Sequence, residues 1–318
     1  MNSDPVNTPF DVAARSRPLV WLPFDPVELG DQPSGLRYEV VASLESAPAS
    51  VGEVEFFVLP YPSGPKLASL LPQLSSLKVV QALSAGVDSI RASIPDSVVL
   101  CNGRGIHDPA TAELAVTLML ASLRGIPRFL AQQRRSEWDD GGELLPTARR
   151  IAIVGYGTIG SAIEARLVPF GFEIVRVARQ AREGVYGFAD LAALLPTLDV
   201  VILAVPLTSE TRGLVDARFL ASLKDDALVV NIARGPVVVT PDIVAALESG
   251  RVRYATDVTD PEPLPPGHPL WAAPNVVITP HVASSTSLLW PRAHKLVSDQ
   301  LRQFADGNPL ANVITGEY

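Results

Sequence analysis

Three side chains in the second half of the chain, Arg234, Glu262 and His281, each follow a short apolar run. An arginine can bind a carboxylate through two N–H groups and polarise a neighbouring carbonyl. A histidine titrates in the range that suits a general acid or base. A glutamate that accepts the other ring N–H fixes the tautomer and raises the histidine pKa. Together they suit proton transfer to a carbonyl that receives a hydride from a cofactor.

Taken singly, each of these residues has a simpler interpretation. Arg234 could be a surface charge, Glu262 a loop acid, and His281 the polar end of a strand. The combination favours catalysis because a cofactor motif precedes it along the chain. The other histidines are weaker candidates. His107 precedes a helix cap and could line a cleft, His268 lies in a Pro-rich loop, and His294 is on the last predicted helix.

A glycine motif lies in residues 151–160, which read Ile-Ala-Ile-Val-Gly-Tyr-Gly-Thr-Ile-Gly. The pattern is an apolar strand, a glycine turn and a helix start. Gly155 permits the tight turn, Gly157 lets the backbone approach a pyrophosphate, and Gly160 allows close packing of helix on strand. The helix N-terminus then directs N–H groups at the phosphates. Because both flanks fit, the motif favours dinucleotide binding over a structural turn.

The next strand, at 173–177, is not followed by the Asp or Glu that usually hydrogen-bonds the adenosine ribose of NAD. It is followed by Arg179 and Arg182, whose guanidinium groups suit the oxygens of a 2′-phosphate. We therefore predict that NADP(H) is preferred, with NAD(H) left open as a second cofactor. The alternative is that both arginines are solvated surface charges.

The elements that must position these residues alternate between strands and helices. Four apolar runs predict strands in the first part of the chain: Leu19–Leu22, Val54–Leu59, Leu77–Leu83 and Val98–Cys101. Ala110–Arg124 predicts a helix that is apolar over most of its surface, and 132–149 predicts a polar loop. The helix would be buried between domains or in a subunit interface.

From residue 150 the alternation becomes regular. It predicts strands at 151–154, 173–177, 200–205, 228–232, 254–258 and 276–279, and helices at 159–169, 189–195, 217–223, 241–248 and 284–304. Such alternation indicates a parallel sheet that is covered on both faces. Ligands of these sheets bind outside the carboxyl ends of the strands, where Arg234, Glu262 and His281 are expected.

Composition excludes several function classes. The 318 residues hold 26 Lys and Arg against 34 Asp and Glu, a net charge of -8 that argues against a nucleic-acid binder. Cys101 is the only cysteine, so no internal disulfide or multi-cysteine metal site can form, and we expect no bound metal. No apolar stretch reaches the roughly 20 residues that span a membrane. We expect a leaderless, cytoplasmic protein.

Motifs along most of the chain resemble, in family order, the D-isomer-specific 2-hydroxyacid dehydrogenases. These motifs are Ser84–Asp88, Ala110–Leu114, Gly155–Gly160, Pro206–Thr211, Asn231–Gly235, Asp257–Pro265, His268–Trp271 and Thr279–His281. The resemblance implies an α/β fold of two Rossmann-like, doubly wound parallel-sheet domains with a cleft between them. Residues 1–101 and 283–318 would form a discontinuous substrate-binding domain, and 102–282 the dinucleotide-binding domain.

The resemblance also implies roles for individual residues. Arg234, Glu262 and His281 would be the catalytic triad, and the backbone N–H groups of Ala85 and Gly86 would help to bind the substrate carboxylate. The cofactor would contact Gly155, Gly157, Thr158, Ile159, Gly160, Arg179, Arg182, Val205, Pro206, Ile232 and Asp257, the last near the nicotinamide amide. The family is usually dimeric through the long helix and its following loop. Trp138 in that loop would reach a partner's cleft or pack in the interface.

Departures from related patterns narrow the activity. Ala283 stands where many members have glycine, which affects local loop geometry only. Glu262 is acidic where formate dehydrogenases of this superfamily carry an amide, and Ala85 stands where phosphite dehydrogenases carry a lysine. These two departures argue against formate dehydrogenase and phosphite dehydrogenase activity. Because the sequence ends at Tyr318, we expect no regulatory extension, and many feedback-regulated phosphoglycerate dehydrogenases are then a poorer match. A phosphoglycerate dehydrogenase is kept as an alternative within the enzyme class.

The NADP-type arginines resemble those of glyoxylate/hydroxypyruvate reductases. We therefore predict an NADP(H)-dependent homodimeric reductase that converts small 2-oxo acids to D-2-hydroxy acids. The alternative from another class is a dinucleotide-sensing, corepressor-like binding protein, which would need an exposed docking patch. No long apolar segment marks such a patch in the sequence.

Overall fold

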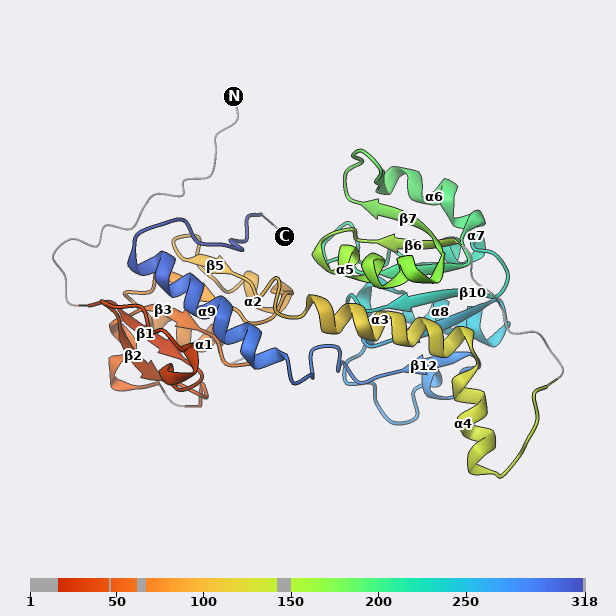
Figure 1. Cartoon of the computed structure of the whole chain (residues 1–318), viewed down its shortest axis with the longest axis horizontal. Coiled ribbons are helices and arrows are strands. Elements are labelled where there is room, and N and C mark those ends of the chain that lie inside the picture. Colours follow the sequence, from red (N-terminus) through yellow and green to blue (C-terminus); the bar gives the residue numbers. More distant parts are fainter. Residues whose placement is uncertain (1–16, 46, 62–66, 142–149, 317–318) are drawn as a thin grey trace. The chain divides into compact units, whose positions relative to one another are not determined.

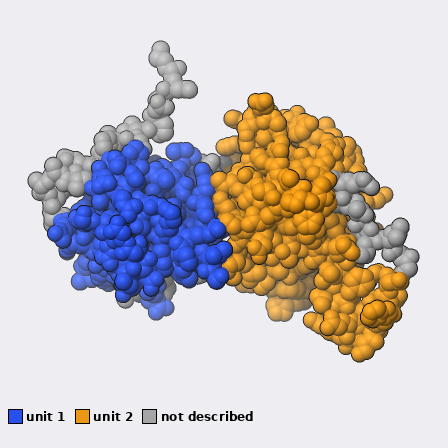
Figure 2. All heavy atoms as spheres, viewed as in Figure 1, with its two compact units in different colours: residues 1–107, 287–318 blue, residues 108–286 orange. Residues whose placement is uncertain are grey.

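The computed structural model describes residues 17–45, 47–61, 67–141 and 150–316. The chain divides into two compact units (Figure 2). Unit 1 comprises residues 1–107 and 287–318, and unit 2 comprises residues 108–286. These borders fall a few residues after those expected from the sequence. The assignment of one unit to substrate and the other to dinucleotide remains a prediction.

Unit 1 contains a five-stranded parallel sheet in the order β2-β1-β3-β4-β5 (Figure 1). Its strands are β1 (Leu19–Leu22), β2 (Arg37–Val40), β3 (Val54–Val58), β4 (Val79–Gln81) and β5 (Val99–Cys101). Strand β2 was not predicted. It lies at the sheet edge and its residues are partly or fully exposed, so it lacks the apolar run that marks the buried strands.

Helices cover both faces of this sheet. One face packs against α1 (Leu67–Leu70) and α2 (Asp88–Arg91), and the other against α9 (Leu289–Ala305). Helix α9 buries Ala293, Val297, Leu301 and Phe304, which recur at helical spacing. The prediction that this helix starts at residue 284 was wrong. The residues from 284 to 287 are Ser-Ser-Thr-Ser, whose hydroxyls compete for backbone hydrogen bonds and disfavour a helix.

Unit 2 contains a seven-stranded parallel sheet in the order β12-β11-β10-β9-β6-β7-β8. The strands are β6 (Arg150–Val154), β7 (Glu173–Ala178), β8 (Tyr186–Gly187), β9 (Val200–Leu203), β10 (Ala227–Asn231), β11 (Val252–Thr256) and β12 (Val276–Ile278). Strand β8 is a two-residue edge strand that the sequence did not predict. The strand order reverses between β6 and β9, and this switch point is where open α/β sheets bind ligands. The predicted class of two doubly wound parallel-sheet domains is confirmed.

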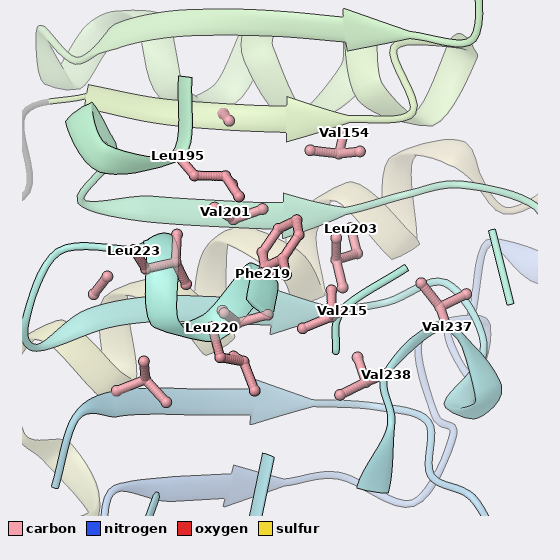
Figure 3. Packing of buried hydrophobic residues seen from close by; sticks show 14 of the residues in the cluster. Val154, Leu195, Val201, Leu203, Val215, Phe219, Leu220, Leu223, Val237 and Val238 are labelled. Carbon is pink, nitrogen blue, oxygen red and sulfur yellow. The ribbon is translucent and has the colours of Figure 1, made fainter. Parts of the chain in front are cut away.

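Alternate side chains of the central strands enter two apolar layers. One layer packs against α6 (Leu191–Leu194), α7 (Ala217–Ser222) and α8 (Thr240–Glu248), as Figure 3 shows for residues such as Val201 and Phe219. The other packs against α3 (Asp108–Leu123) and α5 (Thr158–Leu167). This double burial explains why the strands read as continuous apolar runs. Helix α3 therefore contributes to the core of unit 2, and its expected interface role remains a prediction.

The prediction of a loop at 132–149 was wrong at its start. Residues 132–134 form the last turn of helix α4 (Ile126–Arg134). It follows α3 after Gly125, which has the left-handed conformation. Residues 142–149 of the predicted loop lie outside the described residues. Among the described helices, none alone is long and apolar enough to cross a bilayer, although the bent pair α3–α4 passes that test jointly.

Candidate functional site

The glycine turn after β6 has three glycines with different structural reasons. Gly155 has a φ of 103°, and a Cβ there would lie 2.5 Å from the backbone carbonyl of Ala204. A Cβ at Gly160 would lie 2.8 Å from the Gly155 carbonyl oxygen, so only glycine lets α5 pack this closely. At Gly157, no heavy atom of the described residues other than its own and those of its chain neighbours lies within 4 Å of the Cβ position. The backbone of Gly157 is therefore open to a ligand.

The N-terminus of α5 completes a cradle for an anion. The helix begins at Thr158, and its N-cap is Gly157, which has no side chain to cover the first-turn N–H groups. Because these N–H groups carry the positive end of the helix dipole, Thr158 and Ile159 fit beneath a pyrophosphate. The residues present therefore fit a dinucleotide.

Three more predicted cofactor residues lie at the carboxyl ends of neighbouring strands. Val205 and Pro206 follow β9, and Ile232 follows β10. Val205 and Ile232 are buried, whereas Pro206 is exposed. Their position beside the switch point agrees with the predicted border of the cofactor, and their contact with it remains a proposal.

The two predicted phosphate-reading arginines follow β7. Arg182 Nη2 donates a 2.8 Å hydrogen bond to the carbonyl oxygen of Tyr156, so its guanidinium lies at the glycine turn. Arg179 is exposed, and its Nε lies 3.9 Å from Oε2 of Glu210. Arg176, on β7 itself, is instead held by the buried Glu164 of α5. Arg179 and Arg182 therefore remain the candidates for a 2′-phosphate.

The acid–base pair forms in unit 2. His281 Nδ1 lies 2.6 Å from Glu262 Oε1, and both side chains are more than a third exposed. The Arg234 guanidinium is near enough for its charge to lower the pKa of both groups. Arg234 Nη1 also donates to the carbonyl of Ala233. The structure thus brings together the three residues that were separated by 47 positions in the sequence.

The backbone of His281 is in an unusual conformation. Its φ is 55°, in the left-handed region that side chains other than glycine rarely adopt. The buried Asp257 holds the surrounding loop: its carboxylate accepts from Thr279 Oγ1 (2.6 Å), Val282 N (2.9 Å) and Ala283 N (3.0 Å). Its carbonyl also accepts from His281 N. Such outliers persist only where the surroundings determine them, and they cluster at functional sites.

Sequence reasoning missed this supporting role of Asp257 and Thr279. It assigned Asp257 only a contact with the nicotinamide amide, which remains a proposal. The sequence did contain a signal for this contact, because Asp257 follows β11 and Thr279 follows the adjacent β12. Residues after neighbouring parallel strands meet at one edge of the sheet.

Gly235 explains how the loops of Arg234 and Glu262 approach each other. A Cβ at Gly235 would lie 1.9 Å from the carbonyl oxygen of Thr259, so these backbones are in direct contact. Thr259 N in turn donates to Glu262 Oε2 at 3.3 Å. A larger residue at 235 would separate Arg234 from Glu262.

The hydrogen bond that Glu262 accepts from His281 raises the pKa of His281, against the opposing effects of burial and of the Arg234 charge. The same hydrogen bond lowers the pKa of Glu262. The pair therefore favours a carboxylate beside an imidazolium. Because Nδ1 faces Glu262, Nε2 is the nitrogen that can deliver a proton.

A Glu262→Gln substitution is expected to shift the pH profile of a reaction in which His281 donates a proton. The raised pKa of His281 means that the proton-donating imidazolium is fully present below that pKa and is lost as pH rises through it. Removing the Glu262 charge lowers the pKa, so the alkaline limb of kcat/KM moves to lower pH. Stopped-flow or steady-state rates across pH measure this. Glu248→Gln, at an exposed end of α8, is the matched control, and identical limbs in both variants would contradict the assignment.

Other predicted residues are placed separately. Ala85 and Gly86 follow β4 in unit 1 and are partly buried. Trp138 is fully exposed, and its contact with a partner remains a prediction. His268 accepts from Leu270 N and caps a short turn, so it has a structural role.

Comparison with known proteins decides the family. The model described as "D-isomer specific 2-hydroxyacid dehydrogenase, NAD binding domain" matches residues 116–283, more than half of the chain. The chain belongs to the D-isomer-specific 2-hydroxyacid dehydrogenases. It is therefore an NAD(P)-dependent oxidoreductase that acts on CH–OH donors. The glycine turn and the Arg–Glu–His group both lie inside the matched region.

Relatives within this family include reductases. The chain is 36% identical over 226 residues to the glyoxylate reductase/hydroxypyruvate reductase of Mus musculus, covering 67% of this chain and 69% of the mouse protein. It is 34% identical over 257 residues to glyoxylate/hydroxypyruvate reductase A of Klebsiella pneumoniae, covering 75% and 80%. An NADPH-dependent glyoxylate/hydroxypyruvate reductase of Sinorhizobium meliloti, solved with NADP and sulfate, superposes with a TM-score of 0.80 at 29% identity, covering 95% and 99%.

Proposed function

We propose that this dehydrogenase is an NADP(H)-preferring reductase of small 2-oxo acids of the glyoxylate and hydroxypyruvate type, with D-2-hydroxy acids as products. The observation that carries the proposal is the His281–Glu262 pair, 2.6 Å apart, with Arg234 close enough to act on both pKa values. The reductase relatives support the substrate class, and the arginines after β7 support the cofactor.

The residues perform the reduction in complementary roles. Arg234 binds the carboxylate of the substrate and polarises the adjacent carbonyl. When bound, NADPH supplies the hydride that C2 receives. His281 delivers the proton from Nε2 to the carbonyl oxygen, so that C=O becomes CH–OH. Glu262 stabilises the imidazolium before transfer, and the neutral ring then regains a proton from water.

Cofactor preference follows from charge. Arg179 and Arg182 favour the 2′-phosphate of NADPH, and no acid at the end of β7 favours the free ribose of NADH. Ala85 and Gly86 remain the proposed backbone contacts of the substrate carboxylate. The homodimer and the cytoplasmic location expected from the sequence also remain predictions.

The test is oxidation of NADPH and of NADH in the presence of glyoxylate and hydroxypyruvate, with chiral analysis of the hydroxypyruvate product. We expect turnover with NADPH that falls about 10²- to 10³-fold in Arg234→Ala, the scale of losing a positioned donor to developing charge. Turnover with NADH alone would contradict the cofactor assignment. Tight NADPH binding without turnover of any 2-oxo acid would favour the binding-protein alternative.

A further inference from the structure

The loop after β4 has three consecutive carbonyl groups that are each held by a donor. Gly103 N donates to the Ser84 oxygen at 2.7 Å. Asn102 Nδ2 donates to the Ala85 oxygen at 2.7 Å, and Ser84 Oγ donates to the Gly86 oxygen at 2.7 Å. A hydrogen-bond donor therefore determines the direction of every carbonyl from 84 to 86.

The direction of these carbonyls determines the direction of the amides. In a planar trans peptide, the C=O of one residue and the N–H of the next point in opposite directions. Because Asn102 holds the Ala85 oxygen, the Gly86 N–H is turned away from Asn102. Because Ser84 Oγ holds the Gly86 oxygen, the Val87 N–H is turned away from that hydroxyl. Successive amides fixed in this way are suited to bind an anion.

Asn102 is itself held in one orientation. The residue is 2% exposed, and its Oδ1 accepts from Arg104 N at 3.2 Å, which leaves Nδ2 for Ala85. Its backbone N–H donates to the Asn312 oxygen, and its carbonyl accepts from Gln81 Nε2 at 3.0 Å. The side chain that directs the loop is thus anchored on several sides.

The segment that contains Asn102 also supports Leu83, the residue at which the loop begins. A Cβ at Gly103 would lie 2.2 Å from the Leu83 oxygen, so only glycine permits this approach. His107 Nε2 lies 2.8 Å from the same oxygen, and its buried ring stacks on Tyr61 with centroids 5.6 Å apart. The segment from 102 to 107 therefore forms a rigid support beneath residues 83–86.

We propose that Asn102 and Ser84 are positioning residues: Asn102 directs the Gly86 amide, one of the two proposed contacts of the substrate carboxylate, and Ser84 directs the adjoining Val87 amide toward the same carboxylate. The inference rests on the proposed function, because it needs a 2-oxo acid as ligand. Neither side chain contacts the reacting atoms. Each acts by fixing a peptide plane before the substrate binds, which lowers the ordering cost of binding.

The direct test is Asn102→Asp, which keeps the shape of the side chain and removes its N–H donors. We expect KM for the 2-oxo acid to rise about 10- to 100-fold, the scale of losing a hydrogen bond to a charged group. We expect kcat to change little, and Kd for NADPH, measured by cofactor fluorescence, to stay within about twofold. Asn308→Asp is the matched control, because it makes the same change at an exposed residue of unit 1 that donates through its backbone to the Gln303 carbonyl and not to the loop.

A rise in KM no larger than in Asn308→Asp would overturn the inference. If Asn102→Asp lacks a cooperative melting transition, Ser84→Ala decides, because that side chain is only partly buried. We expect Ser84→Ala to raise KM about three- to tenfold, and an unchanged KM would overturn the inference. Failure of the wild-type enzyme to reduce any 2-oxo acid would instead overturn the proposed function, before either variant is compared.

Discussion

His281→Asn is expected to lower kcat for 2-oxo acid reduction about 10²- to 10⁴-fold, the usual contribution of a general acid. Asparagine is the informative replacement because it tolerates the left-handed backbone that His281 adopts, with φ at 55°. The loop held by Asp257 should therefore keep its conformation while the proton donor is lost. Steady-state kinetics with saturating NADPH measure the fall in kcat, and NADPH fluorescence should show an unchanged Kd.

The matched control is His268→Asn, which changes the same residue type at a position that caps a turn. It should retain wild-type kcat, since His268 lies outside the Arg–Glu–His group. The pH profile gives a second readout, because the limb assigned to the imidazolium should disappear in His281→Asn and persist in His268→Asn. If His281→Asn kept more than about a tenth of the activity, His281 would not be the proton donor.

The second large effect is expected from the double variant Arg179→Ala/Arg182→Ala. Its KM for NADPH should rise about 10- to 100-fold, because charge-assisted hydrogen bonds to the 2′-phosphate are lost. Its KM for NADH should change little, since NADH has no phosphate there. Arg182 is expected to contribute more than Arg179, because its hydrogen bond to the Tyr156 carbonyl positions it before the cofactor binds. Measuring kcat/KM for both cofactors in the double and single variants checks this.

Arg166→Ala separates this local effect from a general loss of positive charge. Arg166 lies on α5 and donates to the carbonyl of Ala162, and it was not assigned to the cofactor. At ordinary salt its charge should be screened from the phosphate, so both KM values should stay near wild type. Equal weakening of NADPH and NADH binding in the double variant would contradict the assignment, because it would show that the arginines do not read the 2′-phosphate.

The sequence alone determined much of this protein because its strong signals are local. Strands that are buried on both faces must be apolar throughout, so nearly all central strands were predicted from short runs such as 151–154 and 200–205. Gly155 and Gly160 were interpreted correctly because a left-handed turn and a close helix–strand approach both require glycine in a narrow sequence window. Edge strands β2 and β8 were missed because partly exposed residues carry no such pattern.

Only the tertiary structure decided how residues far apart along the chain support the site. The hydrogen bond that Asn102 donates to Ala85 joins loops that follow different strands. So do the hydrogen bonds that Asp257 accepts from Thr279, Val282 and Ala283. Polar residues in such loops look alike in sequence, whether they face water or hold a neighbouring loop. Which of them meet depends on strand order and register, and these are set by packing of the whole sheet. The left-handed backbone of His281 is likewise a product of those contacts.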